Sequence, residues 1–336
     1  MRIRNTEVRL RVIFNYTILC LACTTILAIA IINFMEEITP MLVHLHTQAQ
    51  VGCNGHVELC DRRYSNITQI ATHDSAFVGI LPTDDQDVDV TAQLDAGVRF
   101  LQAQTHRNVV GTLSLCHTSC FLKDAGSVES YLEVVKGWLD THPKEVVTLL
   151  LTNGDNVPIN DFDKVFTASG IQPYAYVPGP SHDPSILDSW PTLGELIGNG
   201  TRLVAFLDYG ALDTVPYILP EFLYFWETPF DMTDPSFPQC IIDRPGGVVN
   251  DPAQSHHLMY IVNHFLDTEM LGMDIPDRRD ARKTNSATSG ESINAQVRLC
   301  QQQHDRAPKG ILVDFFDKGD VFGVQDALNG FENAKT

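Results

Sequence analysis

The chain has 336 residues, 44% of them hydrophobic, which is enough for one large domain or two small ones. Its 23 Lys and Arg stand against 42 Asp and Glu, a net charge of −19. A protein this acidic is poorly suited to bind nucleic acid through phosphate contacts or to bind anionic lipid through a polybasic face of its own, so we expect neither mode of binding. Apolar runs recur along the chain and exclude disorder over most of its length.

The N-terminal region contains an uncharged, apolar run over residues 12–35. As a helix this run would be about 36 Å long, against a hydrocarbon core of about 30 Å. Arg residues precede it and two Glu follow it, so the positive-inside rule places residues 1–11 in the cytosol and the body in the lumen or outside the cell. We predict a single-pass signal-anchor over 12–35 and a short stalk over 36–52, with a cleaved signal peptide and a secreted body as the alternative. Glycosylation sequons at Asn66 and Asn199 fit a lumenal body.

Cysteine usage agrees with an oxidising compartment, because the body carries an even number of cysteines. Six cysteines allow 15 pairings. We prefer two local bridges and one long-range bridge: Cys53–Cys60, Cys116–Cys120 and Cys240–Cys300. The spacing is not that of a zinc site.

Short β-branched runs alternate with helical patterns from about residue 66 onward. The expected strands are 67–73, 98–106, 112–117, 146–153, 202–210, 259–267 and 310–317. The expected helices are 88–97, 127–143, 159–170, 192–199, 292–305 and 321–330. Several strands are almost wholly apolar, as is typical of a parallel sheet buried on both faces.

This alternation predicts an α/β fold, and its length fits a closed TIM-type (β/α) barrel, regular or distorted, over residues 53–330, followed by a tail at 331–336. A doubly wound open sheet is the alternative, but no Gly-rich dinucleotide fingerprint follows the first strand. Two long irregular stretches, 229–257 and 270–291, are expected to be functional or mobile loops.

Polar residues close most of the apolar runs, where the active sites of such barrels lie. His73 and Asp74 end the first run, and His117 ends the third. Other runs carry or end in Gln102, Gln104, His106, Asn153, Asp208, Tyr209, Asn263, His264, Asp314 and Asp317. Two histidines, each with a carboxylate partner, suit general acid–base cleavage of a phosphodiester by a neighbouring hydroxyl.

Four segments together resemble the phosphatidylinositol-specific phospholipase C X-domain superfamily, and most of all a fungal branch of phospholipase C-like phosphodiesterases. They are ATHDSAF (71–77), QLDAGVRFLQAQTH (93–106), LCHTSC (115–120) and HPKEVVTLLLTN (142–153). The resemblance extends over roughly residues 53–330. It implies a TIM-type barrel and phosphoric diester hydrolase activity on a lipid head group.

The resemblance also implies residue roles. His73 matches the general base that deprotonates a head-group hydroxyl, and His117 matches the general acid that protonates the leaving oxygen. Asp74 matches the carboxylate that partners His117, and Asp314 matches the one that orients His73. The expected pairs are therefore His73–Asp314 and His117–Asp74. Because Cys116 and Cys120 flank His117 in the sequence, we also expect their bridge to hold this histidine in place.

The sequence departs from the bacterial pattern at the residues that would bind the substrate phosphate. Gln102 and Gln104 stand where those enzymes carry Asp-x-Arg, and a neutral amide forms weaker bonds to phosphate than a cation does. Two glutamines supply no anionic ligand set either, so neither calcium nor any other metal or cofactor is predicted. Asp208 stands where the bacterial enzymes use a basic inositol contact. Gln102, Gln104, Asn153, Asp208 and Tyr209 are the expected substrate-binding residues.

Three functions follow from this pattern, in order of preference. The first is a membrane-anchored, metal-independent phosphodiesterase acting on a phospholipid or glycolipid. The second is an inactive or weakly active barrel that binds an inositol-like or sugar ligand. The third is a metal-dependent glycerophosphodiesterase or sphingomyelinase-D-like barrel, which would need a cluster of acidic ligands that the first strands show only at Asp74.

Overall fold

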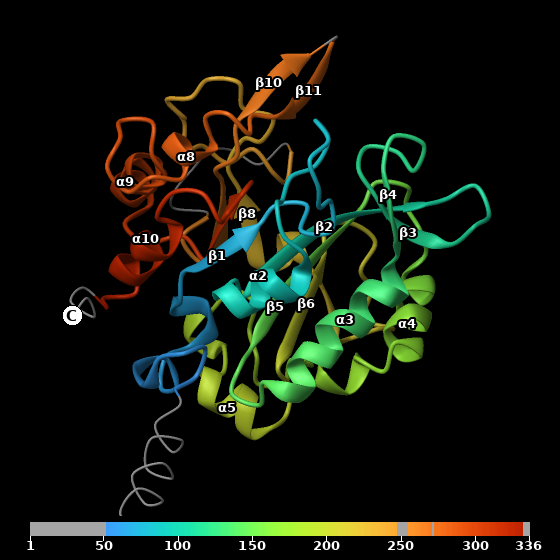
Figure 1. The fold of residues 1–336 in the computed structure, drawn as a ribbon. Coiled ribbons are helices and arrows are strands. Elements are labelled where there is room, and N and C mark those ends of the chain that lie inside the picture. Colours follow the sequence, from blue (N-terminus) through green and yellow to red (C-terminus); the bar gives the residue numbers. More distant parts are fainter. Residues whose placement is uncertain (1–51, 247–254, 271, 332–336) are drawn as a thin grey trace, which may run out of the picture. The chain divides into compact units, whose positions relative to one another are not determined.

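The computed structural model describes residues 52–246, 255–270 and 272–331 (Figure 1). The predicted cytosolic segment, the anchor over 12–35 and nearly all of the stalk and tail lie outside these residues, so those assignments stay predictions. Within the described part of the chain, no helix is both long enough and apolar enough to cross a membrane.

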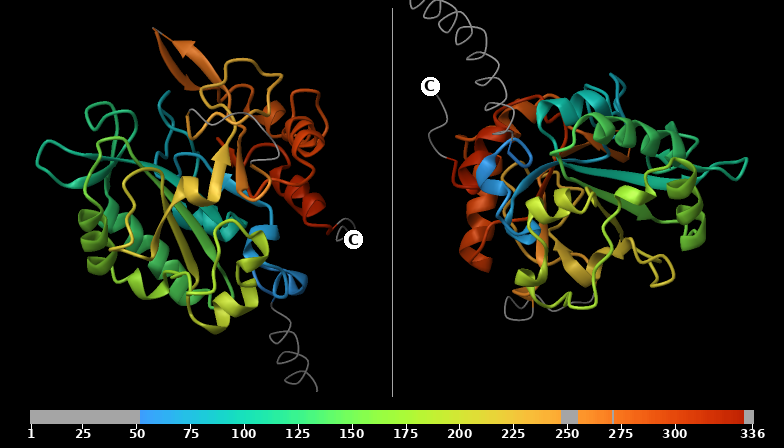
Figure 2. Two further views of the ribbon diagram at one scale, coloured as in Figure 1. Left: turned by 180° about the vertical axis from the view of Figure 1, so that it is seen from behind. Right: turned by 90° about the horizontal axis from the view of Figure 1, so that it is seen from below.

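The core of residues 52–336 is a curled sheet of parallel strands (Figures 1 and 2). Neighbouring strands pair in the order β7-β6-β5-β2-β1-β12-β9-β8. Their bounds are β1 (Gln69–Thr72), β2 (Phe100–Arg107), β5 (Val147–Asn153), β6 (Leu203–Leu207), β7 (Ile218–Pro220), β8 (Phe225–Glu227), β9 (Met259–Asn263) and β12 (Gly310–Val313). Most of these strands are buried along their whole length, which explains their continuous apolar runs.

The expected barrel is confirmed as a curled parallel α/β sheet, but the expectation of a closed ring was wrong. The strand order is that of a barrel, and β7 and β8 are its two end strands. Among the described residues these end strands do not pair with each other and share no neighbouring strand, so the ring stays open. Only the short helix α6 (Glu221–Tyr224) separates them in sequence. A barrel crossover normally needs a dozen or more residues, so this connection is too short to bring β8 beside β7 in a parallel pair.

Helices cover the outside of the sheet (Figure 2, right). Their bounds are α2 (Val90–Ala96), α3 (Val128–Thr141), α4 (Ile159–Ala168), α5 (Leu193–Gly198), α8 (Ala281–Thr284), α9 (Ile293–His304) and α10 (Val321–Leu328). The four 3-10 turns are η1 (Val57–Leu59), η2 (Tyr64–Asn66), η3 (Gln172–Tyr174) and η4 (Leu187–Ser189). Side-chain caps begin several helices, as at Ser127 of α3, whose hydroxyl accepts from the amide of Ser130.

Two antiparallel ribbons differ from the expected barrel elements. The run 112–117 forms β3 (Leu113–Cys116), which pairs antiparallel with β2 and with β4 (Asp124–Ser127) instead of joining the parallel sheet. The stretch 270–291, expected as a loop, contributes to the hairpin of β10 (Asp267–Met270) and β11 (Met273–Pro276) and contains α8. Alternation along 112–117 could not distinguish the two kinds of strand, because both are buried.

The three expected disulfides are confirmed: Cys53–Cys60, Cys116–Cys120 and Cys240–Cys300. The long-range bridge connects the loop after β8 to α9. Both glycosylation sequons place their asparagine on an exposed surface, at Asn66 and Asn199.

Candidate active site

His73 and Asp314 lie side by side at the carboxyl end of the sheet. β1 pairs in register with β12, Thr72 opposite Val313, so the next residue of each strand reaches the same edge. His73 Nδ1 lies 2.9 Å from an oxygen of Asp314. The imidazole also stacks on Phe265, with ring centroids 3.7 Å apart. One face and one nitrogen of His73 are therefore fixed by the protein.

Asp74 is fully buried and is held by the two glutamines of β2. Its backbone amide donates to the Gln102 side chain at 2.7 Å, and its carboxylate accepts from the Gln104 side chain at 2.8 Å and the Gln104 amide at 3.0 Å. The other end of the Gln104 amide group accepts from the backbone of Thr118. Gln102 and Gln104 do line the cavity, as expected, but the side-chain oxygen of Gln102 and both ends of the Gln104 amide group already bind the protein.

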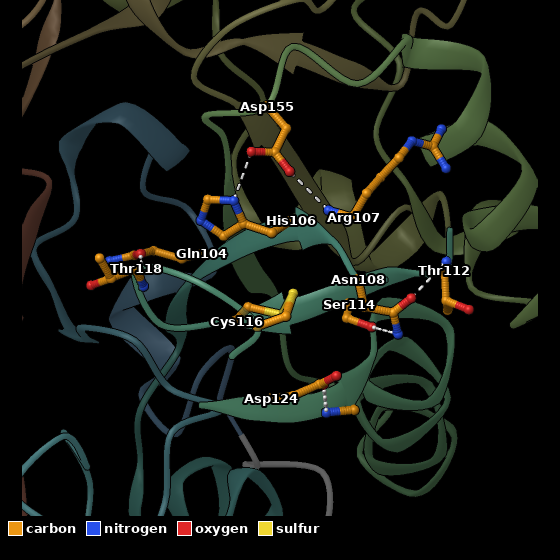
Figure 3. Close-up of a disulfide and its surroundings, with 12 residues drawn as sticks. Gln104, His106, Arg107, Asn108, Thr112, Ser114, Cys116, Thr118, Asp124 and Asp155 are labelled. Carbon is orange, nitrogen blue, oxygen red and sulfur yellow. Dashed lines mark hydrogen bonds and ion pairs between the residues drawn. A yellow bond between two sulfur atoms is a disulfide. The ribbon is translucent and has the colours of Figure 1, made fainter. Parts of the chain in front are cut away.

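His117 reaches the same edge from outside the parallel sheet. It follows β3 directly and begins the loop to β4, which the Cys116–Cys120 disulfide closes (Figure 3). Its Nε2 lies 3.8 Å from a carboxylate oxygen of Asp74. The expected partners are thus neighbours, although this separation is longer than a hydrogen bond. The other ring nitrogen is 3.2 Å from the Thr118 hydroxyl.

Asp85 is a buried carboxylate between the two histidines that sequence reasoning missed. One of its oxygens lies 3.8 Å from His73 Nδ1 and 3.8 Å from His117 Nε2. The side chain is 0% exposed, and neither oxygen has a hydrogen-bond partner among the described residues. Asp85 belongs to two sets of residues that could hold a metal ion. One set includes His73 and Asp314, and the other includes Asp74 and His117.

The pKa values of the two histidines are shifted in opposite directions. Burial lowers the pKa of His73, but the charges of Asp74 and Asp314 outweigh burial and raise that pKa to about 9. Burial lowers the pKa of His117, and the charge of Asp74 offsets this only in part. Burial, with the charges of Asp314 and Asp74, raises the pKa of Asp85 well above its ordinary value. The resting site therefore favours a proton on His73 over one on His117.

Backbone strain occurs next to His73, His117 and Asp314. A residue with left-handed φ directly follows each of them: Asp74 (φ 43), Thr118 (φ 56) and Phe315 (φ 46). Non-glycine residues adopt this conformation only when their surroundings hold them there. At Phe315, the Asn285 side chain donates to the carbonyl at 3.1 Å.

A cavity of about 500 Å³ opens beside His73, Gln102 and Gln104. Asp208 and Tyr209 also line it, as expected, together with Arg244. The Arg244 guanidinium lies 3.0 Å from Asp208 and 3.2 Å from Glu227, so two carboxylates balance its charge.

Asn153 does not line this cavity, contrary to expectation. It is 1% exposed, and its side chain bonds the backbone of Val157 and Tyr209. It supports the loops after β5 and β6, a role that its position at a strand end could not distinguish from substrate contact.

Arg244, Glu227 and Phe265 were also missed. Arg244 lies in the long loop 229–257, where neither period nor motif signals a function. Asp85 follows Asp84 in a polar loop after β1, and a pair of acids there is ordinarily read as a solvated turn. Among the other candidates, His106 lines the cavity with its Nδ1 2.8 Å from Asp155 (Figure 3), whereas His264 is fully buried and bonds Gln296.

Known proteins share both the sequence and the fold. Residues 59–329 match the family model described as PI-PLC X 1. A "PI-PLC X domain-containing protein 1" of the fungus Arthroderma benhamiae is 50% identical over 288 residues, 85% of this chain and 92% of that protein. An "uncharacterized secreted protein" of the same fungus is 42% identical over 278 residues, 81% of this chain but 61% of the relative.

Solved structures share the fold at low identity. A phosphatidylinositol-specific phospholipase C from Listeria monocytogenes has a TM-score of 0.53 at 15% identity, covering 80% of this chain and 94% of its own. The enzyme from Staphylococcus aureus has a TM-score of 0.55 at 15% identity, covering 81% and 95%. With a family model matched over most of its length and a half-identical fungal relative, the chain belongs to the PI-PLC X-domain family.

Proposed function

We propose that this chain is a metal-independent phosphodiesterase that releases the head group of a phospholipid or glycolipid by two-histidine acid–base catalysis. The observation that carries the proposal is the His73–Asp314 hydrogen bond of 2.9 Å, formed beside His117 at the carboxyl end of the sheet. A buried carboxylate at Nδ1 leaves Nε2 of His73 to exchange a proton with substrate.

The first step is attack within the substrate. A head-group hydroxyl next to the phosphodiester gives its proton to His73 as its oxygen bonds to phosphorus. The bond from phosphorus to the lipid oxygen breaks, and His117 gives that oxygen a proton. The products are a cyclic phosphate and the lipid alcohol, and the pair of histidines still carries the same number of protons. Water can then open the cyclic phosphate with the two roles reversed.

The resting protonation is compatible with these roles. The reactive form carries its proton on His117, whereas electrostatics in the free chain favour His73. Both forms contain one proton per pair, so they titrate together and the rate follows the population of the singly protonated pair. Before substrate binds, the reactive form with its proton on His117 is therefore the less populated of the two.

The cavity favours a polyol head group. Asp208 and Glu227 balance Arg244, which leaves hydrogen-bonding groups rather than a free cation to read hydroxyls. The names of related proteins refer to phosphatidylinositol, so inositol lipids are the first class to test. We further propose that residues 12–35 anchor the body to a membrane with its site in the lumen or outside the cell; the relative called secreted fits the cleaved alternative.

The test is a head-group release assay on defined phospholipids and glycolipids, with and without a chelator. His73→Ala and His117→Ala should each lose about 10²–10⁴-fold in rate. His56→Ala is the matched control, because His56 also lies near a carboxylate, 3.9 Å from Asp326, but does not line the cavity. Undiminished turnover in both site variants would reject the mechanism.

A binding protein without turnover is the second candidate. It is favoured by the neutral Gln104 in place of the phosphate-binding arginine and by the use of its amide to hold Asp74. Binding of head-group analogues by a chain inactive on every lipid class would establish this alternative.

A further inference from the structure

The contacts of Asp85 with the two histidines are ion-pair contacts that are too long to be hydrogen bonds. Asp74 and Asp85 each place an oxygen 3.8 Å from His117 Nε2. Hydrogen bonds to nitrogen are about 2.7–3.2 Å long, and two polar atoms bridged by one water are about 4.5 Å apart. Ligand atoms around a tetrahedral zinc ion lie roughly 3.3–3.6 Å apart, because the bonds are about 2.0–2.2 Å long, so each carboxylate oxygen would have to move slightly closer to His117 Nε2 to share an ion with it.

Among the described residues, no donor lies within hydrogen-bond distance of the buried carboxyl group of Asp85. Both of its oxygens are buried and without a hydrogen bond among the described residues. Unsatisfied groups of this kind are rare in native proteins and are commonly explained by an ion or a water. Nearby, Lys123 pairs with Asp84 instead, so that cation does not balance Asp85.

His117 is arranged as a metal-binding histidine. Its Nε2 faces the two carboxylates, and its Nδ1 is within reach of the Thr118 hydroxyl at 3.2 Å. Metal-bound histidines ordinarily bond through the second nitrogen in this way, and their carboxylate co-ligands are themselves hydrogen-bonded. Asp74 meets that condition through Gln104 at 2.8 Å.

A path to the group exists. His73, Asp85 and His117 line one cavity of about 320 Å³, separate from the head-group cavity in most of its lining. The donor atoms of Asp74, Asp85 and His117 all lie within 4.8 Å of one another. The second group around Asp85 is less suited, because His73 and Asp314 already share a hydrogen bond.

We propose that Asp74, Asp85 and His117 form a site for a first-row divalent cation of the zinc type, and that a cation bound there switches the enzyme off. Two carboxylates and one imidazole match the ligands that such ions prefer. The ion takes the lone pair of His117 Nε2, so that nitrogen can no longer carry the proton for the leaving oxygen. Binding is independent of the proposed function, whereas inhibition rests on it.

The test separates binding from activity. The full chain is stripped with a chelator, the chelator is removed, and Zn²⁺ is added in a calorimetric titration. Asp85→Asn keeps the shape of the side chain and should weaken one class of site by at least about tenfold. Asp155→Asn is the matched control, because it alters another carboxylate beside a histidine, His106, and should leave the titration unchanged. Zinc bound elsewhere on the chain appears equally in all three proteins.

A second readout covers a variant that folds poorly. Zn²⁺ should raise the melting temperature of the wild-type chain and of Asp155→Asn, but not that of Asp85→Asn or His117→Gln. In the head-group assay Zn²⁺ should abolish turnover, and a chelator should restore it.

Each outcome bears on one claim. Equal zinc affinity in the wild-type chain and Asp85→Asn overturns the site. If zinc binding depends on Asp85 but turnover requires the bound zinc, the proposed inhibition is wrong. The metal independence of the proposed mechanism is then wrong as well. Asp85-dependent binding by a chain inactive on every lipid supports the site while the proposed function fails.

Discussion

The imidazole of His73 lies parallel to the ring of Phe265, with centroids 3.7 Å apart and planes 3° apart. With Asp314 at Nδ1, this contact leaves the ring one orientation. Phe265→Leu should therefore lower kcat by about tenfold, because the base loses its orientation, whereas the substrate KM should change less, because Phe265 is only one of the residues that line the cavity. Steady-state kinetics check this, with Phe322→Leu on the outer helix α10 as the control. A change confined to KM would contradict it.

The rate should depend on pH as a bell when it is measured in a chelator. Turnover needs one proton on the histidine pair. Above about pH 9 the proton that Asp74 and Asp314 retain on His73 is lost, so the rate falls. Below the lowered pKa of His117, which lies under its ordinary 6.5, both rings are protonated and the rate falls again. A profile with a single limb would indicate that one histidine does not titrate in the reaction.

Asp314→Asn should move the basic limb of that profile to lower pH. The Asp314 charge is one of the causes of the raised pKa of His73, so its removal makes the ring easier to deprotonate. The rate at the optimum should fall by about tenfold, less than in His73→Ala, because Asp314 orients and transfers no proton. An unchanged basic limb with a lower rate would mean that Asp314 acts only on structure.

Gln104→Arg should raise the cleavage of phosphatidylinositol by about tenfold. A guanidinium forms charge-assisted bonds to phosphate, which a neutral amide cannot. The sequence left open whether Asp208 would neutralise such an arginine; in the structure Asp208 is already paired with Arg244. Gln104→Met is the control, since it removes the amide that holds Asp74 and should lower the rate. No gain in the arginine variant would mean either that its guanidinium pairs with Asp74, which Gln104 now bonds, or that the phosphate lies elsewhere.

The topology prediction concerns residues outside the described structure. If residues 12–35 are a signal-anchor, the body should resist protease in sealed microsomes and should carry glycan at the exposed Asn66 or Asn199. Asn66→Gln and Asn199→Gln should each shift the electrophoretic mobility if their site is used. Digestion of the body in intact vesicles would reject the lumenal placement.

The sequence predicted the parts of the fold that local patterns determine. The seven expected strands and six expected helices are all present, because continuous apolar runs and 3.6-residue periods specify them directly. The partner of a strand is a tertiary property, and so β3 was assigned to the parallel sheet although it pairs antiparallel with β2. The open seam between β7 and β8 likewise depends on how the sheet curls, which no local pattern records.

The candidate site divides in the same way. His73, Asp74, His117 and Asp314 carry a recognisable motif or end a strand, and the structure brings them together. Asp85 and Arg244 reach the site from loops that lack any period, so their positions depend on the path of the folded chain. Asn153 was expected to bind substrate but bonds the backbone instead. Its position at a strand end could not separate these roles, because residues of both kinds lie at that edge of the sheet.

The placement of His117 has a consequence for how the proposed activity would be lost on heating. His73 and Asp314 extend from central strands, but His117 belongs to a half-exposed loop that its disulfide closes. Such a loop can open locally at a lower free energy than the barrel needs to unfold. Thermal inactivation would then report the opening of one surface loop, and turnover would end while the sheet and its spectroscopic signature remain intact.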